Sequence, residues 1–99
     1  MSINTYDLGD LVRITGTFKD EDGAVLDPTT VYFEYKTPAG VVTTLTYGID
    51  GSVIRDSTGV YHCDLDANAS GEWYCRWYST GTGQAAEEEV FYVNPTNLA

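Results

Sequence analysis

The chain has 99 residues, the length of one small domain, and carries 5 Lys and Arg against 15 Asp and Glu, a formal net charge of −10. This balance argues against nucleic acid and anionic membranes as partners, because both attract clustered cationic side chains. Eight Tyr, three Phe and two Trp can fill a core, which argues against a disordered chain. Without an apolar run that could span a bilayer or serve as a secretory leader, the sequence predicts a compact acidic domain.

Apolar and polar residues alternate with a period of two in short runs rich in Val, Ile, Thr, Tyr and Trp, and Gly, Pro, Asp and Asn separate these runs. The predicted strands, in chain order, are 11–18, 31–36, 41–47, a short one at 53–55, 59–66, 72–79 and 87–93. Roughly seven strands at this spacing are typical of an antiparallel β-sandwich. We therefore expect one all-β domain over residues 1–99, with a short N-terminal arm (1–8) and a C-terminal tail (94–99).

The apolar faces of the predicted strands define the expected core. Its members are Val12, Ile14, Phe18, Val31, Phe33, Tyr35, Tyr61, Cys63, Leu65, Trp73, Cys75, Trp77, Phe91 and Val93. If 59–66 and 72–79 form a hairpin, one register places Cys63 opposite Cys75 and keeps every large apolar side chain of both strands on one face. Two buried free thiols are the favoured interpretation, and a disulfide between them stays open.

In the last predicted strand, 87–93, charged residues share a face with the residues that are expected to be buried. If Phe91 and Val93 face the core, so do Glu87 and Glu89, and a carboxylate cannot be buried without a partner. Either this strand has a bulge or residues 87–89 project past the end of the core. We favour projection, because residues 84–89 lead straight out of a Gly-rich hairpin tip.

The sequence contains no credible active site, and we expect no catalytic residue, cofactor or metal. His62 is the only histidine, and its place in the alternation predicts that it faces solvent or an interface. The acidic residues that flank one loop (Asp20, Glu21, Asp22 and Asp27) offer oxygen atoms to Ca²⁺ but lack the spacing of a calcium loop. A solvated turn is the favoured interpretation, and we expect the chain not to be an enzyme.

The outward aromatic residues form a candidate interaction face. If 31–36 lies beside 72–79, one exposed surface combines Tyr32, Glu34, Lys36, Tyr74, Arg76 and Tyr78. Tyr and Arg are enriched among the residues that dominate binding energy at protein interfaces. Two interpretations stay open: cross-strand pairs that stabilise the sheet, and a docking face for another protein.

The segment DSTGVYHC at 56–63 resembles the tyrosine-corner segment of immunoglobulin-like domains. It has one extra residue between Asp56 and Tyr61, and the second cysteine lies downstream instead of upstream. Counting strands under this resemblance places 59–66 as the fifth (E), 72–79 as the sixth (F) and 87–93 as the seventh (G). The disulfide of antibody domains is therefore not carried over.

A second resemblance covers nearly the whole chain, through YDLGDLVRITG at 6–16, DPTTV at 27–31, DSTGVY at 56–61, GEWYCRW at 71–77 and FYV at 91–93. The pattern is similar to small immunoglobulin-like proteins encoded among the head and neck genes of tailed bacteriophages. The resemblance implies an immunoglobulin-like antiparallel β-sandwich and a virion structural protein, made in the cytoplasm of the bacterial host.

The implied role is that of a capsid decoration (cement) protein, which binds the major capsid protein or other virion proteins in many copies. The alternatives are a head–tail connector or tail accessory protein, and a glycan-binding surface module. The acidic residues at turns and strand ends favour solubility before assembly and would repel the packaged genome, so we expect the domain on the exterior of the head. Docking onto a locally basic patch should then depend on salt.

Overall fold

A computed structural model describes residues 4–81 and 86–95 of the chain. The described residues form strands and no helix, so the all-β prediction is confirmed. The strands are β1 (Asn4–Asp7), β2 (Leu11–Thr17), β3 (Thr30–Lys36), β4 (Val42–Thr46), β5 (Val53–Ser57), β6 (Val60–Asp66), β7 (Gly71–Thr80) and β8 (Ala86–Asn94). Among these residues, no helix is long and apolar enough to cross a membrane.

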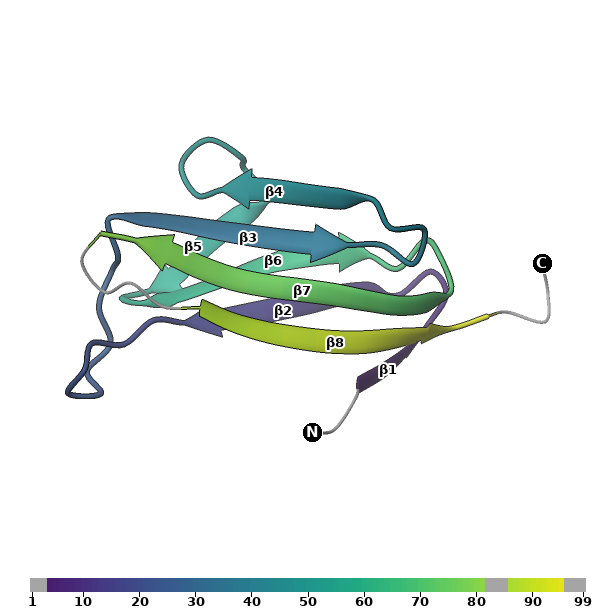
Figure 1. The fold of residues 1–99 in the computed structure, drawn as a ribbon, viewed down its shortest axis with the longest axis horizontal. Coiled ribbons are helices and arrows are strands. Elements are labelled where there is room, and N and C mark those ends of the chain that lie inside the picture. Colours follow the sequence, from purple (N-terminus) through teal and green to yellow (C-terminus); the bar gives the residue numbers. More distant parts are fainter. Residues whose placement is uncertain (1–3, 82–85, 96–99) are drawn as a thin grey trace.

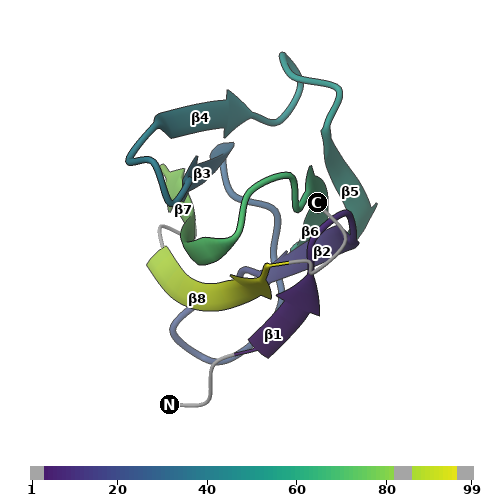
Figure 2. The same ribbon diagram turned by 90° about the vertical axis from the view of Figure 1, so that its right-hand side faces the viewer.

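The strands form two sheets that pack face to face (Figures 1 and 2). One sheet has the order β1-β8-β7-β3-β4 and the other the order β2-β6-β5. In immunoglobulin-like sandwiches, strands C, F and G share one sheet, and B, E and D share the other. The places of β6, β7 and β8 confirm their assignment as E, F and G, and the chain is an immunoglobulin-like β-sandwich.

The prediction of an N-terminal arm over residues 1–8 is wrong for its described part. Residues 4–7 form β1, which pairs in parallel with the end of β8 and is the one parallel pair among the described strands. The ring of Tyr6 packs edge-on against Phe91, with 5.5 Å between centroids. Four residues are too short for a visible period of two, so this strand depends on its tertiary partner. In the predicted tail, Asn94 belongs to β8, and residues 96–99 lie outside the described residues.

The predicted hairpin between 59–66 and 72–79 is wrong. β6 pairs with β2 and β5, whereas β7 pairs with β3 and β8, so the two strands lie in opposite sheets. Both strands direct their apolar faces into one core, and strands that face each other across a core show the same alternation as strands that lie side by side. Cys63 and Cys75 are free and buried, and burial raises their pKa values to about 11 and about 12.

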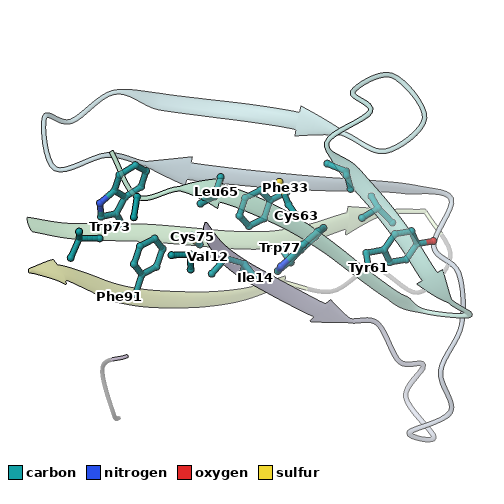
Figure 3. Close-up of a cluster of buried hydrophobic side chains, with 14 of the residues drawn as sticks. Val12, Ile14, Phe33, Tyr61, Cys63, Leu65, Trp73, Cys75, Trp77 and Phe91 are labelled. Atoms are coloured by element: carbon teal, nitrogen blue, oxygen red, sulfur yellow. The ribbon is translucent and has the colours of Figure 1, made fainter. Parts of the chain in front are cut away.

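The core lies between the sheets and contains nearly every residue predicted for it (Figure 3). Tyr35 is only partly buried, beside the edge strand β4, and Val53 and Ala67 join the core. The ring of Trp77 packs 4.6 Å from that of Phe33. Other buried members are Val12, Ile14, Phe18, Val31, Tyr61, Cys63, Leu65, Trp73, Cys75, Phe91 and Val93.

Gly16 of β2 lets the two sheets approach at Trp77. A Cβ atom at position 16 would lie 2.6 Å from Cγ of the Trp77 side chain, far inside van der Waals contact. This close approach explains why an otherwise apolar or β-branched strand position is occupied by glycine.

The projection of residues 87–89 past the core is wrong for Glu89. The β7–β8 register has no bulge in its described pairs, and Glu89 lies opposite Cys75 near the middle of β7. Glu89 is half-buried. Because β1 pairs only with residues 91–94, residues 86–90 form an open sheet edge, from which a long side chain can extend its carboxylate to water. The side chain of Glu87 and residues 82–83 of the predicted hairpin tip (81–83) lie outside the described residues.

Candidate functional site

The predicted interaction face is assembled on the outer surface of the five-stranded sheet. β3 pairs with β7, and the outward positions face one another as Tyr32 with Tyr78, Glu34 with Arg76, and Lys36 with Tyr74. The alternate residues of both strands point into the core. We refer to these six side chains as the β3–β7 face.

Stacked rings and overlying cations organise the β3–β7 face. The rings of Tyr32 and Tyr78 stack with 4.9 Å between centroids and 18° between planes. The guanidinium carbon of Arg76 lies 4.8 Å from the Tyr78 ring centroid, and Nζ of Lys36 lies 4.9 Å from that of Tyr74. Cations are attracted to ring faces in this geometry, so the face is ordered before any partner binds.

Hydrogen bonds hold the acidic side chains around this face. Glu34 accepts a hydrogen bond of 3.1 Å from the hydroxyl of Thr44 on β4. The hydroxyl of Tyr74 donates to Glu72 at 2.7 Å, and this bond raises the pKa of Tyr74. Between these groups is an open hollow of about 260 Å³, lined by Glu34, Tyr35, Lys36, Val42, Tyr74, Cys75, Arg76 and Glu88. This volume lies just below the about 300–1,000 Å³ that small-molecule pockets usually enclose.

The outer surface of the three-stranded sheet is organised by ion pairs. Arg13 of β2 forms two hydrogen bonds with Asp64 of β6, at 2.9 and 3.1 Å. The guanidinium of Arg13 lowers the pKa of Asp64, and Asp64 raises the pKa of Arg13. Exposed pairs of this kind contribute little to stability.

Asp27 connects the loop before β3 with two strands of the opposite sheet. Its carboxylate accepts hydrogen bonds from the Arg55 guanidinium at 3.0–3.2 Å, from N–H of Gly59 at 2.9 Å and from the hydroxyl of Tyr61 at 3.0 Å. The Arg55 bond and the Gly59 N–H lower the pKa of Asp27 to about 2. Burial, with the bond to Asp27, raises the pKa of Tyr61 to about 12. In the tyrosine corner of immunoglobulin domains the hydroxyl binds backbone, whereas here it binds the side chain of Asp27.

The acidic loop that suggested Ca²⁺ uses its oxygen atoms within the chain. Oδ1 of Asp20 accepts hydrogen bonds from N–H of Asp22 and of Ala24, as expected of a solvated turn. Asp27 belongs to the Arg55–Tyr61 network. Within the described ranges, no group of three or more His, Cys, Asp or Glu side chains could hold a metal ion.

The expectation that His62 faces solvent or an interface is wrong. The residue is only 5% exposed, and its Nδ1 lies 2.7 Å from a carboxylate oxygen of Asp56. His62 lies on the central strand of its sheet, between Thr15 and Ile54, and a bulge between Arg55 and Ser57 marks the neighbouring strand at Asp56. The alternation of apolar and polar residues correctly placed His62 outside the core. It did not reveal that the two neighbouring strands bury this side chain. His62 Nε2 is buried with no hydrogen-bond partner among the described residues.

Comparisons with known proteins identify no family for this chain. No protein-family model matches the chain, and no curated protein matches it. Among solved structures, it is similar to the crystal structure of the ZIG-8 IG1 homodimer, at 12% identity, over 97% of this chain and 81% of that chain, with a TM-score of 0.49. A similarity at this level carries no argument about what the chain binds.

Proposed function

We propose that the chain is a non-enzymatic binding module that docks on another protein through its β3–β7 face. The observation that carries this proposal is the ordered Tyr and Arg cluster, in which Arg76 and Lys36 cover tyrosine rings on an exposed sheet. Immobilising flexible side chains opposes association, so residues that are ordered in advance lower this cost. Tyr and Arg also supply the largest binding energies at interfaces.

The biological setting that we propose is the particle of a tailed bacteriophage, where the module decorates the outside of the head shell. The sequence resemblance over nearly the whole chain supports this role, as does a chain of net charge −10 that repels packaged nucleic acid. A repeated shell lattice would bind many copies, so a modest interface in each copy is sufficient.

A protein partner fits the face better than a glycan does. A sugar ring stacks on a free aromatic face, but Arg76 covers one face of Tyr78, and Tyr32 stacks on the same ring. Lys36 likewise covers the ring of Tyr74. The N–H donors of Arg76 and Lys36 remain suited to carboxylate or carbonyl oxygens of a protein.

The test uses phage particles that lack this protein, titrated with the isolated chain and two arginine variants. Arg76→Ala should weaken binding by about thirtyfold or more, the effect of losing a residue that dominates an interface. Arg13→Ala is the matched control, because Arg13 is an outward arginine on the opposite sheet. Equal binding of Arg76→Ala and wild type, or equal weakening by both variants, would contradict the proposal.

Two further readouts separate the decoration role from its alternatives. Quantitative mass spectrometry of particles should find many copies for a decoration protein and only one ring for a connector. Binding should weaken as salt rises, because a chain of net charge −10 docks on a basic patch. Binding to glycan arrays without binding to particles would favour the surface-module alternative.

A further inference from the structure

β4 forms an open edge of the five-stranded sheet. It pairs with β3 on one side, and the sheet order ends there. Figures 1 and 2 show β4 as the outermost strand, with only the connection to β5 near its C-terminal end. A free strand edge presents backbone N–H and C=O groups that can pair with another strand.

The edge at β4 is uncharged and apolar in a strongly acidic chain. Residues 37–49 contain no Asp, Glu, Lys or Arg, although 20% of the whole chain is charged. Four of the large hydrophobic residues that are exposed belong to this segment: Val41 (59% exposed), Val42 (56%), Tyr47 (41%) and Ile49 (81%). This edge therefore has no charged side chain that would discourage pairing with another strand.

The other sheet edges carry features that discourage pairing. The part of β8 that pairs with β7 but not with β1 contains three consecutive glutamates at 87–89. β5 has a register shift between Arg55 and Ser57, with the charged Asp56 at that point. β1 has only four residues. β2, the other edge of the three-stranded sheet, carries the charged Arg13. Charges, bulges and short strands all discourage pairing at sheet edges, so β4 is the edge best suited to pairing.

The hydrogen bonds around β4 identify the groups that point outward. N–H of Tyr47 donates to C=O of Val31, and N–H of Thr37 donates to C=O of Val41. In an antiparallel pair, the residues that bond to the partner strand alternate along the strand. The odd-numbered residues of β4 therefore bond to β3, and the even-numbered residues direct their N–H and C=O groups to the open edge.

At one of these residues the outward groups already have partners. N–H of Thr46 donates to the Asp50 carboxylate at 2.8 Å, and C=O of Thr46 accepts from N–H of Ile49 and of Asp50. The outward N–H and C=O groups of Val42 and Thr44 remain on the open edge, and these two residues define a pairing site.

We propose that this edge pairs with the same edge of a second copy of the chain in an antiparallel arrangement. A two-fold axis at Thr43 would place Val42 of each copy opposite Thr44 of the other, and every outward N–H and C=O of both residues would then be paired. A two-fold contact uses the same patch on both copies, which this self-complementary edge allows. The Val–Thr and Thr–Thr neighbours that result are suited to strand pairs.

The uncharged edge is the part of this acidic chain where a second copy meets the least repulsion. Two chains of net charge −10 repel each other, and this repulsion is weakest where neither surface carries a charge. Salt screens the repulsion, so self-association should strengthen as salt rises. Docking on a basic partner should weaken under the same change, and the two proposals can therefore fail separately.

Sedimentation velocity of the isolated chain over a range of concentrations tests this proposal. Wild type should form a dimer that is enriched at high salt. Thr44→Pro removes the outward N–H and the hydroxyl but keeps the backbone hydrogen bonds to β3, and it should weaken the dimer by about thirtyfold, because each copy loses a backbone donor. Thr44→Val, which loses the same hydroxyl but keeps the N–H, should still form dimers.

A second pair of variants guards against misfolding of Thr44→Pro. Val42→Lys places a charge on the exposed edge and should also give a monomer, whereas Val25→Lys makes the same change at an exposed position away from β4 and should leave the dimer intact. A wild-type chain that stays monomeric at high concentration and high salt would overturn the proposal. A dimer that survives both Thr44→Pro and Val42→Lys, or binding of this edge only to a strand of another protein, would also overturn it.

Discussion

Arg13 and Arg76 lie in matching places on the two outer surfaces but interact differently. Each projects from a strand toward water, and each lies opposite a carboxylate on the neighbouring strand: Asp64 for Arg13, and Glu34 for Arg76. Arg13 binds its carboxylate through two hydrogen bonds. Among the described residues Arg76 forms no ion pair and lies over the ring of Tyr78.

We propose that this difference separates a surface whose charged groups bind one another from a surface whose hydrogen-bond donors bind a partner. Asp64 occupies the guanidinium donors of Arg13, and Asp27 does the same for Arg55. On the β3–β7 face, the carboxylate of Glu34 accepts from Thr44, and Arg76 lies over the ring of Tyr78 and forms no ion pair among the described residues, although Glu88 lies opposite it on β8. In the proposed account, the three-stranded sheet supports the fold and the five-stranded sheet offers the binding surface.

The largest expected effect on stability comes from the core that supports both surfaces. Gly16→Ala forces a methyl group into the ring of Trp77 and should lower the free energy of unfolding by about 1–3 kcal/mol. Gly51→Ala is the control, since a Cβ atom there meets nothing within 4 Å. Urea unfolding of both variants measures the difference. Equal stabilities would mean that the sheets are not in close contact at Trp77.

The next effect tests the link between Asp27 and Tyr61. Tyr61→Phe removes one hydrogen bond at a buried hydroxyl and should lower the free energy of unfolding by about 0.5–1.5 kcal/mol. Tyr47→Phe removes the hydroxyl of a more exposed tyrosine whose ring contacts Tyr61, and it should change little. If urea unfolding gave the same loss for both variants, the hydroxyl of Tyr61 would have no particular role.

The loss of stability at acidic pH should report the protonation of the Asp27 carboxylate. Its pKa is about 2 in the folded chain, below the ordinary 3.8, so the charged form stabilises the fold. This contribution is complete above about pH 4 and is lost as pH falls toward about 2. The unfolding midpoints of wild type and Asp27→Asn should therefore differ at neutral pH and converge over that interval. A difference that stays constant with pH would contradict the proposed role of the charge.

The smallest effects compare the two arginines directly. Arg13→Ala should lower stability slightly, and this loss should shrink at high salt, because an exposed ion pair is screened. Arg76→Ala should lower stability by no more than the about 0.5–1 kcal/mol of an exposed cation–π contact, and this loss should not depend on salt as that of an ion pair does, because the residue makes no ion pair among the described residues. A salt-dependent loss in Arg76→Ala would remove the distinction between the two surfaces.

Alternation along the sequence correctly predicted which side chains enter the core and which form the β3–β7 face. It did so because burial on one side of a sheet imposes a period of two, whichever sheet contains the strand. For the same reason it failed on the hairpin of 59–66 with 72–79, since it does not report which strands are neighbours. The count that assigned these strands as E and F already places them in opposite sheets of an immunoglobulin-like fold.

Contacts between residues far apart in the chain explain the other features that the sequence did not predict. The burial of His62 depends on both neighbouring strands and on the carboxylate of Asp56, none of which alternation predicts. The hydrogen bonds that Asp27 accepts join residues 28–34 positions apart in the chain. Strand β1 forms only because β8 offers an edge to residues 4–7. These contacts come from tertiary structure, and local residue patterns do not determine them.

Under the proposal that a tailed bacteriophage encodes this chain, a cryo-EM map of its particles would test the central claim most directly. We predict density for the sandwich on the outside of the head, with the β3–β7 face against the shell and Arg76 next to an acceptor on the capsid protein. The three-stranded sheet, with its Arg13–Asp64 pair, should face solvent. Contact through the three-stranded sheet, or particles without this protein, would contradict the account.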